Sequence, residues 1–128
     1  MKQKRLPPGG CSLHPRFRML CGTAIAFGPG KADLLEALRQ TGSITKAAGR
    51  LGMSYMRAWT LIRTMNRCFS EPVVVAIRGG TKGGGGAALT KTGREVLGLY
   101  RRMEHKCVSI VQPDWKKFQK LFKKRLRK

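Results

Sequence analysis

The chain has 128 residues, the length of one ordinary domain, so one compact core is the most that it can build. Its 27 lysines and arginines outnumber 6 aspartates and glutamates and give a formal net charge of +21 at pH 7. With 41% hydrophobic residues it is a folding sequence, which excludes collagen-like, disordered and acidic classes of protein. A surface with this much positive charge predicts a polyanionic partner.

The sequence predicts no membrane partner and a cytoplasmic, nucleoid-associated location. No apolar run approaches the about 20 residues that a membrane-spanning helix needs. The apolar stretch 19–27 follows Arg16 and Arg18, as in a signal peptide. Cleavage at Ala24–Ala26 would leave only residues 19–23 as the apolar region, which is shorter than the about 7 residues required.

No metal, cofactor or enzymatic site is expected. The four cysteines lack the short paired spacing of a disulfide framework, so reduced thiols are the default. The alternative is a Cys₂His₂ zinc site from Cys11 with His14 and His105 with Cys107, but neither pair has the spacing of a zinc finger. Two histidines without a nearby carboxylate, and acids that occur singly, supply no acid–base pair for catalysis.

The first third of the chain predicts an arm, a hairpin and a helix. Residues 1–16 are expected to form a flexible basic arm, because Pro7–Gly10 breaks any periodicity. Apolar residues alternate with other residues early in the segment 17–27, which ends at a turn that contains glycine and proline. This pattern predicts two short strands in a β-hairpin. Leucines and alanines on one side of residues 32–40 then predict a helix.

Two short helices joined by a turn are predicted over residues 42–67, which is the pattern of a helix-turn-helix. Ser43 is the expected cap of the first helix, Gly52 supplies the turn, and Ser54 is the expected cap of the second. The inner face of the second helix is expected to contain Ala58, Trp59, Ile62 and Met65. Its outer face is basic, with no acid between Glu36 and Glu71, as a major groove requires.

A hairpin with a glycine-rich tip is predicted after this motif. Residues 73–77 are rich in valine and predict a strand, and Ala87–Leu89 can return as its partner. Such a hairpin is the wing of a winged helix-turn-helix, lying along phosphate backbone or minor groove. A phosphate-binding P-loop is the alternative, but Lys82 is followed by glycine and then a strand. A flexible tip without any partner is a third interpretation.

A long helix is expected over residues 91–112. Thr90 opens it, and Thr92 with Glu95 has the spacing of a capping box. A heptad-like apolar stripe favours a dimer seam, although the same stripe could pack on its own domain. The stripe residues are Val96, Tyr100, Met103, Cys107 and Ile110.

Residues 113–128 predict a basic amphipathic tail, with Trp115, Phe118, Phe122 and Leu126 on one face. Such a segment can lie on anionic lipid, follow nucleic-acid backbone, or remain a solvated tail. Beside a winged helix we favour contact with nucleic-acid backbone.

Several short motifs match a known family. They are Gly42-Ser43-Ile44 with Ala47-Ala48, Ser54-Tyr55 with Ala58-Trp59, Ile62 with Met65-Asn66, and the glycine-rich stretch 79–86 leading to Leu89-Thr90 and Gly93. In these, residues 17–107 resemble the N-terminal DNA-binding domain of ModE-type molybdate-responsive regulators, and more loosely LysR-type regulators. The resemblance implies a dimer on a palindromic operator. The family's oxyanion site lies in domains beyond the dimer helix, so molybdate binding is not expected of this sequence.

Together these features predict an α+β protein, with an N-terminal β-hairpin, a winged helix-turn-helix over 17–90 and a long C-terminal dimerisation helix. The predicted function is a non-enzymatic, homodimeric transcription regulator that binds double-stranded DNA. The alternatives are a sequence-tolerant architectural nucleic-acid-binding protein and, third, a membrane-surface or partner-binding basic protein. The residues expected to face base edges are Ser54, Tyr55, Met56, Arg57 and Thr60. Those expected at the DNA backbone are Ser43, Thr45, Lys46, Arg63, Arg78, Thr81, Lys82 and Lys91.

Overall fold

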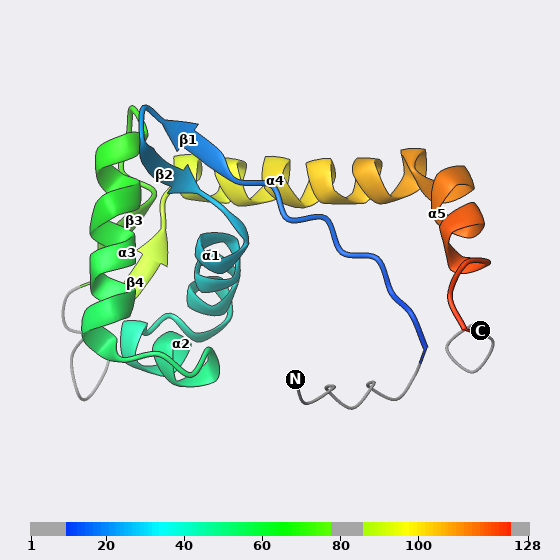
Figure 1. Cartoon of the computed structure of the whole chain (residues 1–128). Helices are drawn as coiled ribbons and strands as arrows, with labels where there is room; N and C mark the ends of the chain where they lie inside the picture. The colour runs from blue at the N-terminus through cyan, green and yellow to red at the C-terminus, as the bar shows by residue number, and fades with distance from the viewer. Residues whose placement is uncertain (1–9, 78–85, 124–128) are drawn as a thin grey trace. The chain divides into compact units, whose positions relative to one another are not determined.

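A computed structural model describes residues 10–77 and 86–123. The chain divides into a larger part, residues 16–102, and a smaller part made of residues 1–15 with 103–128. Helices and two small antiparallel sheets confirm the predicted α+β class (Figure 1). In chain order the elements are β1 (Met19–Cys21), β2 (Ala24–Phe27), α1 (Pro29–Thr41), α2 (Ile44–Arg50), α3 (Tyr55–Cys68), β3 (Val74–Ala76), β4 (Ala87–Leu89), α4 (Lys91–Ile110) and α5 (Gln112–Gln119).

The core of the larger part gathers around α1. The aliphatic face of this helix is buried, together with Ala47 and Ala48 of α2 and with Ala58 and Met65 of α3. The two adjacent alanines of α2 allow a close approach to α1, since they add little side-chain bulk between the helix axes. Helices α2 and α3 are therefore fixed on one packed body.

Local sequence explains where these helices begin and end. Gly42 and Gly52 each have a φ of 66°, a left-handed conformation that glycine adopts without strain. The hydroxyl of Ser43 accepts a hydrogen bond from the N–H of Lys46, and that of Ser54 accepts one from the N–H of Arg57, at 3.2 and 3.1 Å. Both predicted serine caps are confirmed.

The second sheet is tied to the helices on both sides. In it Val74 pairs with Leu89 and Ala76 with Ala87. The side-chain oxygen of Asn66 in α3 accepts hydrogen bonds from the N–H groups of Val73 and Val74, at 2.8 and 3.3 Å. These contacts fix β3 against α3. Arg78, Thr81 and Lys82, at the predicted hairpin tip, lie outside the described residues.

The first half of α4 belongs to the core, which corrects part of the predicted dimer stripe. Tyr100 is 1% exposed, its hydroxyl donates to the carbonyl oxygen of Phe17 at 2.9 Å, and its ring meets that of Phe27 edge-on. Val96 packs partly buried against the same core. Both residues follow the alternative interpretation, in which the stripe packs on its own domain.

Helix α4 begins at Lys91 after Thr90, as predicted, but its predicted capping box is corrected. The hydroxyl of Thr90 accepts a hydrogen bond from the N–H of Gly93 at 2.9 Å and donates one to the carbonyl oxygen of Pro72 at 2.6 Å. Thr90 is thus the cap of the helix, and the described contacts contain no capping-box bond between Thr92 and Glu95. Because Thr90 also bonds to the segment before β3, the cap joins two elements.

The smaller part contains an aromatic cluster. The helix expected over 91–112 ends at Ile110, and α5 follows it. Trp115 stacks on Phe118 at 6.4 Å between ring centroids, and Phe122 contacts both rings. A hollow of about 290 Å³ lies beside this cluster, lined by Leu13, Pro15, Cys107, Val108, Val111, Asp114, Trp115 and Phe118.

Within residues 10–77 and 86–123, no helix is both long and apolar enough to span a bilayer. The same residues contain no group of three or more histidine, cysteine or acidic side chains that could hold a metal ion. Cys11, Cys21, Cys68 and Cys107 are free thiols.

Candidate nucleic-acid interface

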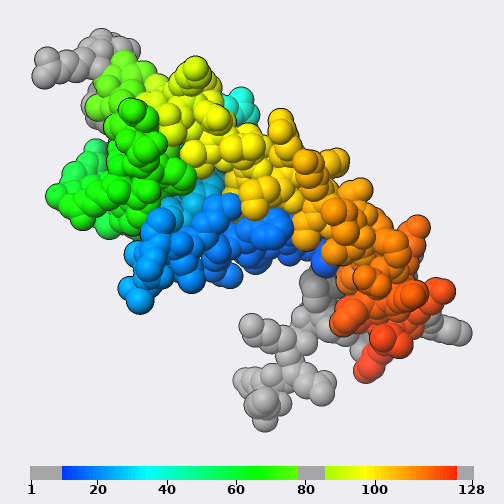
Figure 2. Space-filling model, turned by 90° about the horizontal axis from the view of Figure 1, so that it is seen from above, coloured from blue at the N-terminus to red at the C-terminus, as the bar shows by residue number. Residues whose placement is uncertain are grey.

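Helix α3 presents one side to the core and the other to solvent. Ala58, Ile62 and Met65 recur at the spacing of one helical face and are buried. Met56 and Arg57 lie away from this face and are exposed, and Tyr55 is exposed at the first turn of the helix. In the space-filling view α3, in green, forms an outer edge of the larger part (Figure 2). This side of α3 is therefore accessible to a ligand.

Trp59 lies on the exposed side of α3, so its predicted place on the inner face is wrong. Its residue exposure is 38%, and the guanidinium carbon of Arg63 lies 5.1 Å from the centre of its ring. The residues of α3 that are buried at this point are Ala58 and Ile62. Sequence reasoning therefore missed an exposed aromatic side chain at the interface.

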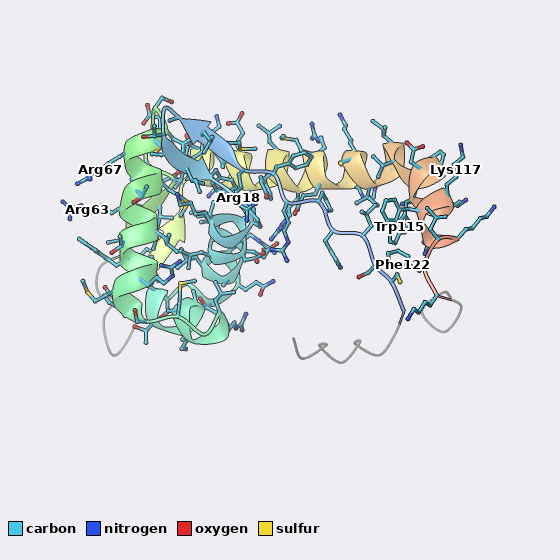
Figure 3. The ribbon with its side chains drawn as sticks, viewed as in Figure 1. Arg18, Arg63, Arg67, Trp115, Lys117 and Phe122 are labelled. Atoms are coloured by element: carbon cyan, nitrogen blue, oxygen red, sulfur yellow. The ribbon has the colours of Figure 1, made fainter. Side chains whose placement is uncertain are left out.

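The cations of α3 have no acidic partner among the described residues. Arg57, Arg63 and Arg67 form no ion pair with a carboxylate of residues 10–77 or 86–123. Arg63 and Arg67 project outward from the helix (Figure 3). Because α3 itself contains no acid, its exposed side attracts anions.

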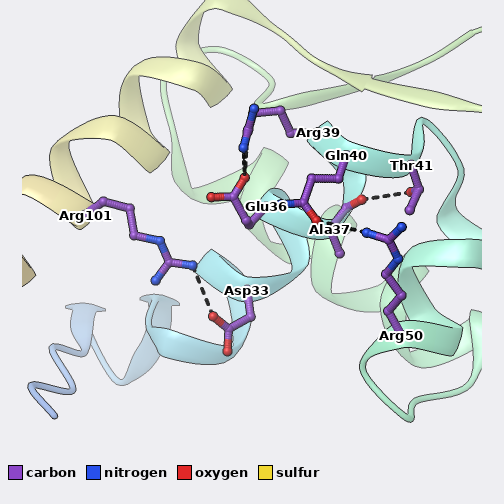
Figure 4. A network of polar contacts seen from close by, with 8 residues as sticks. All are labelled: Asp33, Glu36, Ala37, Arg39, Gln40, Thr41, Arg50 and Arg101. Carbon is purple, nitrogen blue, oxygen red and sulfur yellow. Dashed lines mark hydrogen bonds and ion pairs between the residues drawn. The ribbon is translucent and has the colours of Figure 1, made fainter.

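The acids of α1 are instead paired with arginines. Asp33 lies 3.1 Å from Arg101, and Glu36 accepts a hydrogen bond from Arg39 at 2.6 Å (Figure 4). Arg50 of α2 donates to the side-chain oxygen of Gln40 at 2.9 Å. Negative charge is thus neutralised on α1, while the positive charge of α3 stays available.

The other residues that were predicted to contact DNA lie in or beside α2, α3 and α4. Ser43 is 6% exposed and its hydroxyl caps α2, which corrects its predicted place among the phosphate contacts. Thr45 and Lys46 are exposed in the first turn of α2, and Lys91 is exposed at the start of α4. Thr60 is exposed, and its hydroxyl donates to the carbonyl oxygen of Met56 at 2.8 Å.

Known proteins resemble this chain, although no family model matches it. It is 43% identical over 83 residues to the molybdenum transport protein ModE of Azotobacter vinelandii, covering 65% of this chain and 30% of that protein. It is 42% identical over 82 residues to the molybdenum-pterin-binding protein MopB of Rhodobacter capsulatus, covering 64% and 30%. It is 36% identical over 89 residues to the DNA-binding transcriptional dual regulator ModE of Escherichia coli K12, covering 67% and 34%.

These similarities confirm the predicted resemblance to ModE-type regulators. The chain spans about 30% of the length of the first relatives that it matches.

Proposed function

We propose that this chain is a DNA-binding transcription regulator in which residues 42–89 form a winged helix-turn-helix. In this assignment α3 enters the major groove, and β3 with β4 forms the wing. The observation that carries the proposal is the exposed side of α3, which is basic, contains no acid and is fixed on a packed core. The resemblance to a regulator named for DNA binding supports it.

The exposed side chains of α3 suit the edges of base pairs. Arg57 can donate two hydrogen bonds to a guanine, the most common specific contact in a major groove. Ser54, Tyr55 and Met56 precede it on the first turn of the helix. The hydroxyl of Thr60 already donates within the helix, so it offers its methyl group and an acceptor lone pair to a base.

Backbone contacts flank this surface in the proposal. Thr45, Lys46, Arg63 and Lys91 are exposed, and phosphate contacts of this kind set the register of a protein on the duplex. The wing residues Arg78, Thr81 and Lys82 complete the set. Molybdenum transport and molybdenum–pterin binding, named for two relatives, are not part of the proposal, because the similarity covers only 30% of those proteins.

The test selects a binding site from a pool of random duplexes and measures affinity for it. We expect an inverted repeat to be enriched. Arg57→Ala should lose about 1 to 3 kcal/mol of binding free energy on the selected duplex while binding to a scrambled duplex is almost unchanged, because a base contact discriminates between sequences. The control is Arg39→Ala, which removes an arginine that is paired with Glu36 on α1. Equal weakening on both duplexes would favour the architectural nucleic-acid-binding alternative.

We also propose that the chain forms a homodimer. The seam uses the apolar surface of the smaller part, where Met103 and Phe118 are exposed, Ile110 is 77% exposed and Leu121 is 83% exposed. Exposed large apolar side chains beside an apolar hollow indicate a surface that a second copy can cover. Two copies would place two recognition helices on the two halves of an inverted repeat.

Ile110→Lys should convert the dimer into a monomer, because a charge replaces an apolar side chain at the seam. Ser109→Lys adds the same charge at the neighbouring exposed position and should leave the dimer intact. Sedimentation equilibrium of both variants and of the parent chain measures this. A parent chain that is monomeric at concentrations where it binds its selected duplex would contradict the dimer.

A further inference from the structure

Trp59 and Arg63 lie one turn apart on the exposed part of α3 and contact each other. The guanidinium carbon of Arg63 lies over the indole ring of Trp59, 5.1 Å from the ring centroid. This cation–π contact acts through the charge of the guanidinium and does not use its N–H groups as donors. The contact therefore restricts the rotamers of Arg63 while its N–H donors stay available.

The surroundings of this pair are well fixed. A shallow hollow of about 350 Å³ lies along the second half of α3, lined by Trp59, Ile62, Arg63, Asn66 and Arg67. Ile62 is buried, and the side chain of Asn66 is bonded to β3, so neither is free to move into the hollow. Arg63 and Arg67 project outward next to it (Figure 3). The hollow thus has a rigid wall and two cations.

We propose that Trp59 is a positioning residue, which holds the guanidinium of Arg63 ready for a phosphodiester oxygen of duplex DNA, with Arg67 as a second cation one turn further along. This inference rests on the proposed function. The occupant is an oxyanion, because bidentate donation from a planar guanidinium fits the oxygens of a phosphate. Preorganisation strengthens binding because less rotamer freedom is lost when the contact forms.

A double-mutant cycle on duplex affinity tests the coupling of the two residues. Trp59→Ala and Arg63→Ala should each weaken binding about threefold to tenfold, and the double variant should be no weaker than Arg63→Ala alone. The losses should be equal on selected and scrambled duplexes, because a phosphate carries no sequence information. Trp59→Phe, which keeps an aromatic face, should bind within about twofold of the parent chain, whereas Trp59→Leu, which keeps only apolar bulk, should resemble Trp59→Ala.

A spectroscopic readout separates the sources of the phosphate. The chain contains two tryptophans, so Trp115→Phe leaves Trp59 as the only one. Its fluorescence should change saturably with duplex DNA, and should not change with inorganic phosphate at constant ionic strength. A saturable response to inorganic phosphate would show a free-anion site and overturn the assignment to DNA. Thermal melting of every variant checks that the fold is kept.

Two further outcomes would overturn the positioning role. Additive losses in the cycle would show that Trp59 and Arg63 act independently. A loss confined to the selected duplex would show that Trp59 itself reads a base. In both cases the parent chain still selects a duplex, so the proposed function stands; if the parent chain binds no duplex, the proposed function and this inference both fall.

Discussion

At Gly93, α4 lies in close contact with the segment before β3. A Cβ atom built on Gly93 would lie 2.0 Å from the carbonyl oxygen of Val73 and 3.0 Å from its carbonyl carbon. The same Val73 oxygen accepts a hydrogen bond from the N–H of Thr90 at 3.0 Å. Because both neighbours are backbone atoms in a bonded segment, neither can move away cheaply.

Gly93→Ala should therefore destabilise the fold by at least about 1 to 3 kcal/mol, the usual cost of forcing extra atoms into a packed site. Gly98 lies in the same helix, and a Cβ atom added there would meet nothing within 4 Å, so it is the matched control. Gly98→Ala should be neutral or stabilise by up to about 1 kcal/mol, because alanine favours a helix over glycine. Chemical denaturation measures both, and equal effects would contradict the close contact at Gly93.

Element ends show where sequence reasoning succeeds. Ser43, Ser54 and Gly42 act on backbone groups within a few residues, so their roles can be predicted from local sequence alone. The cap of α4 differs, because Thr90 and Thr92 have equal chemistry and the choice depends on Pro72, far away in sequence. A tertiary contact of this kind leaves no local pattern.

The faces of the helices show where sequence reasoning fails. Trp59 is adjacent to the buried Ala58, and hydrophobicity alone cannot distinguish a core indole from one at a ligand surface. Tyr100 fits a dimer stripe by spacing, yet its hydroxyl bonds to the carbonyl oxygen of Phe17, which lies just before β1 in the same chain. An apolar helix face has the same periodicity whether its own domain or another molecule covers it. Only long-range packing decides which of the two does.

Thr90→Ala should cost about 0.5 to 2 kcal/mol of unfolding free energy, the usual effect of removing a helix cap. Part of this loss arises because the N–H of Gly93 then has no side-chain acceptor. Thr92→Ala is the control, since no capping bond of Thr92 is present in the described part of the chain. Thermal unfolding of both variants distinguishes the two threonines, and a larger loss for Thr92→Ala would restore the capping box predicted from sequence.

At the scale of the whole molecule, charge is distributed unequally among the elements. Asp33 and Glu36 on α1 are neutralised by arginines, whereas α3 has only cations. Lys116, Lys117 and Lys123 in the smaller part are exposed. Since the net charge of the chain is +21, most of its attraction for a polyanion is independent of the residues that we propose to read bases.

The contribution of these three lysines to binding can be measured by replacing them. Replacing Lys116, Lys117 and Lys123 together by glutamine should weaken binding to selected and scrambled duplexes equally. The slope of log affinity against log salt should become shallower by about 0.9 for each phosphate contact that is lost. Replacing the same three by arginine keeps the charge and should preserve the slope.

The reason for this expectation is that exposed lysines bind phosphate mainly by releasing counterions, which depends on charge and hardly on sequence. The aromatic rings of Trp115, Phe118 and Phe122 contact one another and the three lysines are exposed, so the glutamine variant should keep the melting temperature of the parent chain. Titrations at several salt concentrations measure both slopes. If the glutamine variant keeps the parent slope while Arg63→Ala makes it shallower, Arg63 contacts phosphate and these three lysines do not.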